Sequence, residues 1–183
     1  PPPAAPRPSR RPSPPPGRPA RSSLPLFPAP HLPAARGGPG SAPPPRSLPR
    51  QQQLTGRGGP AGRACRFYIM RLPAKGLRFD RITHHKLCTQ CLGGLGPEPW
   101  YLAVAAASEE GPREEDLQAF RIPPGVFVQM DEGTWHAGPL FAGAAERDFY
   151  NLELSDTNQV DHHNHVYARE GLAFEIVDSG EEP

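Results

Sequence analysis

Residues 67–82 read FYIMRLPAKGLRFDRI, two short runs rich in aromatic and aliphatic side chains on either side of the segment Pro-Ala-Lys-Gly. Short apolar runs of this kind, each closed by turn residues, predict β-strands. The same texture recurs every ten residues or so, roughly the spacing of strands in sandwiches and barrels. The predicted strands are residues 67–72, 77–82, 87–92, 100–106, 118–122, 126–130, 149–154 and 172–177.

Turn chemistry predicts that these strands run antiparallel. The segments 93–97 (GGLGP), 123–125 (PPG) and 131–133 (DEG) supply the backbone angles that tight reversals require. Parallel strands would need crossover helices, and only the Glu-rich segment 109–117 has a weak helical pattern, which is too short to cover a sheet. We therefore expect an all-β fold, an antiparallel barrel or jelly roll.

Residues 1–65 differ in composition from the rest of the chain. They hold 20 of the 28 prolines and ten arginines but no Asp or Glu. Such a segment buries too little apolar surface to offset its ordering entropy, so we expect a disordered Pro/Arg-rich leader. A transit peptide, a polyproline ligand for partner modules and a sequence foreign to the protein remain alternatives to plain disorder. The folded domain is then expected over residues 66–178, with a flexible tail at 179–183.

Charge divides the chain into two opposite parts. Residues 1–79 carry thirteen Arg and one Lys against no acid, a formal charge of +14, and from Asp80 onward six basic residues face nineteen acidic ones, giving −13. The acidic domain argues against nucleic-acid binding. No apolar run approaches the length of about 20 residues that a membrane helix needs, and three cysteines form no disulfide framework. We expect a cytoplasmic protein, or a plastid one if the leader is a transit peptide, with a small molecule as its partner.

Two polar stretches interrupt the strand pattern, HHKLCTQ at residues 84–90 and GTWHAGP at residues 133–139. Imidazole and amide side chains can ligate a metal, although two histidines and a glutamine can equally be hydrogen-bonded barrel residues. Neighbouring residues of a strand point to opposite faces, so only one of His84 and His85 can face a barrel interior. Periodicity alone does not choose between them.

The recognisable residues, in chain order, are His85-x-x-x-Thr89-Gln90, a strand ending in Ala105, Leu117-x-Ala119-Phe120, Gly133-x-Trp135-His136-x-x-Pro139-Leu140 and Asp148-Phe149. Together they resemble the ureidoglycolate lyase family, also called ureidoglycolate hydrolases, a branch of the cupins. The resemblance covers about residues 66–155. It implies a cupin-type β-barrel, often a homodimer, that splits ureidoglycolate into glyoxylate and urea during allantoin breakdown in purine catabolism.

The resemblance also implies the site. It identifies His85 as the motif histidine, and it implies that a divalent metal, with nickel as one candidate, is bound by the catalytic residues His85, Gln90 and His136. The carboxylate and hydroxyl of the substrate can chelate such a metal, which acidifies the hydroxyl. Gln90 stands where many metal-binding cupins have glutamate, and a neutral ligand favours an anionic substrate.

An acid must protonate the leaving urea nitrogen, and its candidates are His84, Asp148 and Glu153. Asp148 is kept as a catalytic residue, and the substrate pocket is expected to include Trp135 and Glu153. The resemblance further implies barrel strands before residue 67, so we expect a barrel that lacks part of its N-terminal side. The alternative functions are a non-catalytic cupin that binds a ligand, or a leader that recruits polyproline-binding modules.

Other suggestive residues are given structural roles. Cys88 and Cys91 have the spacing of a redox or zinc half-site but no second pair, so core packing is expected. The run DHHNH at residues 161–165 follows a polar stretch and is interpreted as a solvated loop without a metal role. Trp100 and Tyr101 are expected in the core.

Overall fold

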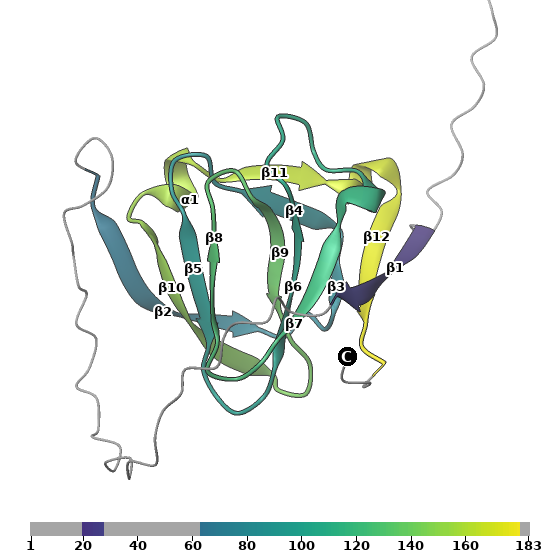
Figure 1. Cartoon of the computed structure of the whole chain (residues 1–183), viewed down its shortest axis with the longest axis horizontal. Coiled ribbons are helices and arrows are strands. Elements are labelled where there is room, and N and C mark those ends of the chain that lie inside the picture. Colours follow the sequence, from purple (N-terminus) through teal and green to yellow (C-terminus); the bar gives the residue numbers. More distant parts are fainter. Residues whose placement is uncertain (1–19, 28–62, 180–183) are drawn as a thin grey trace, which may run out of the picture.

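The computed structural model describes residues 20–27 and 63–179. In this part of the chain the strands form two sheets (Figure 1). The smaller sheet has the order β2 (Cys65–Pro73), β10 (Glu146–Leu154), β5 (Gln90–Gly94) and β8 (Phe127–Met130). The larger has the order β11 (His163–Val166), β4 (Arg81–His84), β9 (Trp135–Leu140), β6 (Trp100–Ala105), β7 (Gln118–Ile122), β1 (Ala20–Phe27), β12 (Leu172–Val177) and β3 (Arg78–Phe79).

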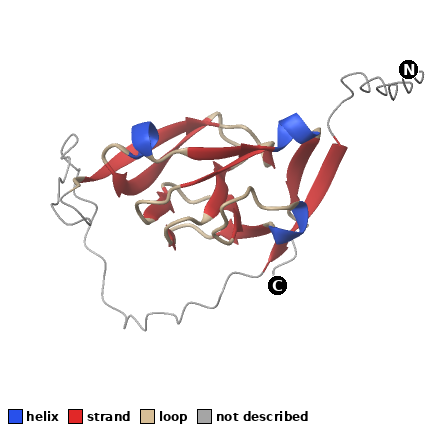
Figure 2. Cartoon of the chain, turned by 90° about the horizontal axis from the view of Figure 1, so that it is seen from above, coloured by secondary structure: helices blue, strands red, loops and turns tan. Residues whose placement is uncertain are grey.

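Every pairing in the two sheets is antiparallel except the two that β1 makes. The expected all-β, cupin-type barrel is therefore confirmed. Helical segments are short and lie at the margins of the strands (Figure 2): η2 (Glu114–Asp116), α1 (Thr157–Val160) and η3 (Tyr167–Glu170). Within the residues that the structure describes, no helix has the length and apolar character needed to span a membrane.

Strand β1 corrects the interpretation of residues 1–65 as a leader without structure. It pairs in parallel with β12, Leu24 opposite Ile176, and with β7, Leu26 opposite Ala119. Leu24 is buried in the core. The average composition of residues 1–65 does not reveal this strand, in which Leu24 and Leu26 alternate with other residues and point to the same face. β1 also supplies the barrel with a strand from before residue 67. The remaining residues of the predicted leader, apart from 63–65, lie outside the described part of the chain, as does most of the predicted tail.

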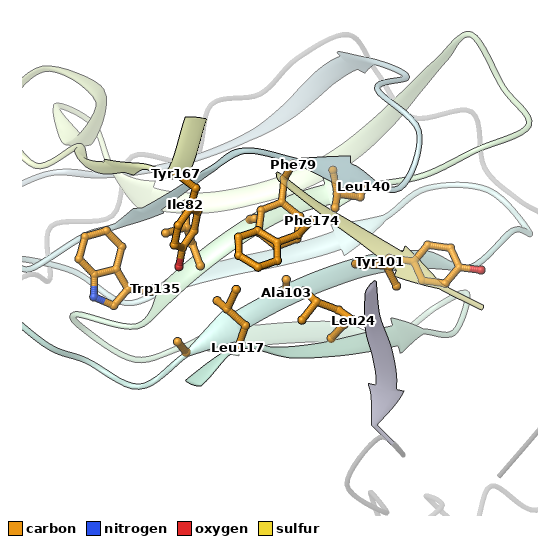
Figure 3. Close-up of a cluster of buried hydrophobic side chains, with 14 residues drawn as sticks. Leu24, Phe79, Ile82, Tyr101, Ala103, Leu117, Trp135, Leu140, Tyr167 and Phe174 are labelled. Atoms are coloured by element: carbon orange, nitrogen blue, oxygen red, sulfur yellow. The ribbon is translucent and has the colours of Figure 1, made fainter. Parts of the chain in front are cut away.

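The core has two clusters, one on each face of β6. Tyr101, Ala103 and Ala105 belong to the cluster in Figure 3, which joins β6 to β1, β9 and β12. Trp100 and Leu102 point the other way and pack with side chains of the smaller sheet. The strand is thus buried on both faces, which explains its continuous apolar sequence WYLAVA. This confirms the core assignment of Trp100 and Tyr101.

The observed strands depart from the predicted ones mainly at polar segments. The predicted strand 77–82 is split into β3 and β4, and the predicted strand 87–92 starts only at Gln90. Besides β1, two strands were not predicted: β9, which contains Gly138 and Pro139, and β11, whose sequence HNHV is polar. The weak helix at 109–117 is reduced to the single turn η2. All three cysteines are free, as expected.

Candidate functional site

A cavity of about 510 Å³, partly open to solvent, is lined by residues of both sheets. Its size is in the range of small-molecule pockets. The wall is half apolar, with Met70, Leu72, Leu92 and Leu140, and half polar. The polar lining residues are Tyr68, Lys75, Arg78, Asp80, Arg81, Thr83, His85, Gln90, His136, Asn151, Glu153, Asn158 and His162.

Strand alternation decides which motif residues enter the cavity. His85 continues the face of β4 that carries Arg81 and Thr83, and all three line the cavity. His84 faces the other way, where its ring stacks on Trp135 with centroids 3.8 Å apart. Burial is the main cause of a lowered pKa of His84. Of the two neighbouring histidines, the one singled out by the family motif is thus the one at the cavity.

His85 and His136 face each other across this wall, with ring centroids 5.3 Å apart. Nδ1 of His85 lies 2.5 Å from the backbone oxygen of Asp161, and Nδ1 of His136 lies 3.2 Å from that of Thr134. A carbonyl oxygen only accepts, so each ring must donate its Nδ1–H, which leaves the lone pair of the neutral ring on Nε2. Burial is the main cause that lowers the pKa of His136 to about 4, so this ring is neutral near pH 7.

Gln90 is held at the same wall by two acceptors. Its Nε2 donates to Oδ1 of Asn151 at 3.1 Å and to Oε2 of Glu153 at 3.2 Å. Both neighbours accept, which assigns the nitrogen to that side of the amide and leaves Oε1 on the other. Oε1 is buried and has no hydrogen-bond partner among the described residues. A buried carbonyl oxygen without a partner is uncommon in folded proteins.

A hydrogen-bond network of side chains on β2 and β10 holds the Gln90 amide in place. Glu153 Oε1 accepts hydrogen bonds from Arg66 at 2.8 Å and from the Tyr68 hydroxyl at 2.9 Å, and the same hydroxyl accepts from Asn151 Nδ2 at 2.9 Å. Burial, followed by the charge of Glu153, raises the pKa of Tyr68. Glu153 lines the cavity as predicted, but its oxygens are engaged with Arg66, Tyr68 and Gln90. Its place in the structure is that of an anchor for the amide.

Two of the predicted site residues lie away from the cavity wall. Asp148 is on the outer face of β10, opposite Arg71 of β2, and its carboxylate binds the Arg71 guanidinium at 2.8 and 2.9 Å. Trp135 belongs to the core cluster of Figure 3 and donates its indole N–H to Ser108. In both cases the alternation of side chains along a strand is the reason. Phe149, next to Asp148, packs in the second core cluster, and His136, next to Trp135, lines the cavity. Trp135 was predicted to line the pocket because it is next to His136 in the sequence, but its side chain lies on the opposite face of β9.

The run DHHNH at residues 161–165 was interpreted as a solvated loop, and the structure corrects this. Asp161 is almost fully buried, and its carboxylate accepts hydrogen bonds from the backbone N–H groups of Lys86 and Leu87, both at 2.8 Å. His162 lines the cavity, and its ring meets that of His85 at 5.6 Å. Burial, followed by the charge of His85, lowers the pKa of His162. The dense run of polar residues could have indicated this role, since the polar side chains of such a segment can hydrogen-bond to the residues of a site.

The cavity wall contains side chains of the types that can ligate a metal ion. Within the described ranges, no group of three or more His, Cys, Asp and Glu side chains is arranged to hold a metal ion. The atoms available at the wall are Nε2 of His85, Nε2 of His136 and Oε1 of Gln90, two imidazole lone pairs and an amide oxygen. Imidazole rings oriented by backbone carbonyls are typical of metal ligands.

The comparisons with known proteins identify the family. A family model described as ureidoglycolate lyase matches residues 47–174. The chain belongs to the ureidoglycolate lyase family. This confirms the resemblance carried by the motif residues between His85 and Phe149. The match begins at residue 47, before the predicted domain boundary at residue 66, which stays a prediction. Among curated proteins, none matches the chain.

Proposed function

We propose that this protein cleaves ureidoglycolate into glyoxylate and urea, the carbon–nitrogen lyase reaction of its family, as a step of allantoin breakdown. One observation carries the proposal. His85, His136 and Gln90 line one cavity, and His85 Nε2, His136 Nε2 and Gln90 Oε1 have no hydrogen-bond partner among the described residues. Such a wall suits a ligand that brings its own donors or a cation.

The reaction needs little beyond orientation and a path for one proton. The hydroxyl of ureidoglycolate loses its proton, its oxygen forms the aldehyde double bond of glyoxylate, and the bond from the same carbon to nitrogen breaks. The nitrogen of the leaving urea gains a proton, so no water is consumed. The substrate hydroxyl can donate to Oε1 of Gln90 or to Nε2 of His136. The apolar wall at Met70 and Leu92 limits the access of water.

A divalent metal would be held by Nε2 of His85, Nε2 of His136 and Oε1 of Gln90. When bound there, it would supply Lewis acidity that makes the substrate hydroxyl easier to deprotonate. Nickel remains one candidate, and nitrogen and oxygen donors of this type suit several divalent ions. The residues of the chain do the rest: the Asp161 carbonyl and Glu153 hold His85 and Gln90 in their orientations.

The test is glyoxylate release from ureidoglycolate by the full chain, with and without added Ni²⁺, Mn²⁺ or Zn²⁺. His136→Gln and Gln90→Ala are expected to lower kcat/KM about 100-fold or more, the order found when metal or transition-state contacts are removed. Asp148→Asn is the control, because that carboxylate lies outside the cavity, and it should leave kcat/KM within about twofold. Binding of substrate without release of glyoxylate would favour the non-catalytic cupin instead.

A homodimer is the second part of this proposal. The outer face of the smaller sheet carries an apolar surface in which Ile69 and Phe127 are 51% and 55% exposed, and Tyr150 stacks between Phe127 and Phe67. A contiguous apolar surface on a charged domain is typical of an interface. We expect a second copy to pack on it. Ile69→Lys combined with Phe127→Asp should convert a dimer into a monomer in light scattering, and a dimer that survives both changes would contradict this.

A further inference from the structure

Eight of the twelve basic side chains in the described part of the chain have a hydrogen-bond or ion-pair partner. Most of them pair with a carboxylate, and Arg147 binds three backbone carbonyls. This is expected in a domain with an excess of acid. The described basic side chains without any hydrogen bond or ion pair are Arg21, Lys75, Arg81 and Arg169.

Two of these four, Lys75 and Arg81, line the cavity. The cavity also has Arg78, which is bound to Glu175 at 3.1 Å, and two acids, Asp80 and Glu153. Glu153 is neutralised by Arg66 at 2.8 Å. Of the charged lining residues that are not already paired, two are cations, Lys75 and Arg81, and one is a carboxylate, Asp80. The free charge on the wall is therefore positive, although the domain as a whole is acidic.

Arg81 and His85 lie on one line of the wall. Alternation along β4 gives Arg81, Thr83 and His85 the same face, and four residues of extended strand span about 13 Å. An arginine side chain is long and flexible, so its guanidinium can extend along the wall toward His85, as binding of the adjacent carboxylate and hydroxyl groups of one α-hydroxy acid requires. Both Arg81 and Lys75 are exposed at this wall, so their side chains are free to move toward a ligand.

We propose that Arg81, assisted by Lys75, binds the carboxylate of the substrate and thereby restricts the cavity to small hydroxy acids that carry one negative charge. The planar guanidinium matches a carboxylate with two parallel hydrogen bonds, which a lysine cannot reproduce. Arg81 is then a specificity-determining residue, and His85, His136 and Gln90 receive the hydroxyl end. The inference rests on the proposed function for the choice of hydroxyl and carboxylate as the two ends of the ligand.

The test compares two inert probes that differ only in charge, glycolate and its neutral amide glycolamide. Dissociation constants for both are measured by ligand-observed NMR titration of the full chain. Wild type is expected to prefer glycolate by roughly 10- to 100-fold, the range given by hydrogen bonds to a charged group. Arg81→Gln should abolish this preference by weakening glycolate alone. Lys75→Gln should reduce it less, and Arg81→Lys should restore part of it.

The chain offers matched controls, since Arg21 and Arg169 are also unpaired cations but do not line the cavity. Arg21→Gln and Arg169→Gln should leave both dissociation constants unchanged, and raised salt should weaken glycolate only where Arg81 is present. The proposal is overturned if Arg81→Gln and Lys75→Gln bind glycolate as wild type does, or if Arg81→Gln weakens both probes equally. Glyoxylate release is measured separately: a preference that depends on Arg81 without turnover refutes the proposed function alone, and turnover that is indifferent to Arg81 refutes the subsite alone.

Discussion

Acid should destabilise this protein through His136 before most of its carboxylates titrate. Burial is the main cause that lowers the pKa of this imidazole from 6.5 to about 4, and only the hydrogen bond to the Thr134 carbonyl works against it. In the unfolded chain the same ring is solvated and takes up its proton near pH 6.5. Between these two values the unfolded state therefore binds one proton more than the folded state does.

The sign and size of the effect follow from this difference. Stability rises with pH wherever the unfolded state binds more protons, so it must fall as the pH is lowered from about 6.5 towards 4. At roughly 1.4 kcal/mol for each pH unit between the two pKa values, the full loss is about 3 kcal/mol. About 2 kcal/mol of it should be lost by pH 5. Below the folded-state pKa both states are protonated and the contribution no longer changes.

The assay is urea denaturation at pH 7, 6 and 5 in the presence of a chelator, for wild type and for His136→Gln. The variant lacks the titrating ring, so its unfolding free energy should fall about 2 kcal/mol less than that of wild type between pH 7 and pH 5. His84 and His162 also have pKa values lowered mainly by burial, but they are present in both proteins and cancel in the difference. Parallel pH curves for the two proteins would refute the reasoning.

Three further predictions concern stability and are checked by urea denaturation at pH 7. Leu24→Ala should cost about 2–5 kcal/mol because Leu24 is buried in the core, and a loss below about 1 kcal/mol would show that β1 does not belong to the barrel. Asp161→Asn should cost about 2–3 kcal/mol, since the amide cannot accept from both backbone N–H groups that the carboxylate now binds, and an unchanged midpoint would contradict that clamp. Gly94→Ala should cost about 1–3 kcal/mol because its Cβ would lie 2.7 Å from the fully buried Trp100 ring. Gly93→Ala is the matched comparison and should cost less, since its neighbour, the exposed Phe127 ring, can turn away.

Local sequence patterns predicted those parts of the fold in which the pattern is strong. The alternating or continuous apolar runs of β2, β6, β7 and β12 were placed within one or two residues. They could be predicted because the side chains that define them are buried by the sheet itself. In contrast, β9 and β11 are rich in His, Gly, Pro and Asn, and they become strands only through their neighbours. His163 pairs with His84, and His136 with Thr83, contacts that no local pattern contains.

The candidate site shows the same division. The motif residues His85, Gln90 and His136 line one cavity, and the resemblance to the family was enough to single them out. The partners that orient them were not predictable in this way. Asp161 reaches His85 from 76 positions later in the chain, and Glu153 reaches Gln90 from 63 positions later. Long-range partners of this kind are set by topology, and a single sequence without a fold does not locate them.

The surroundings of Gln90 explain why an amide stands there. A glutamate at this position would place its carboxylate about where Nε2 now lies, within roughly 3 Å of both Glu153 Oε2 and Asn151 Oδ1. Two buried carboxylates at that distance cannot both be ionised at low cost, and Glu153 is already committed to Arg66 and Tyr68. The amide satisfies both acceptors with its nitrogen and adds no second negative charge beside Glu153. The wall therefore combines neutral side chains with the unpaired cations Lys75 and Arg81, and these cations are the groups that favour an anion.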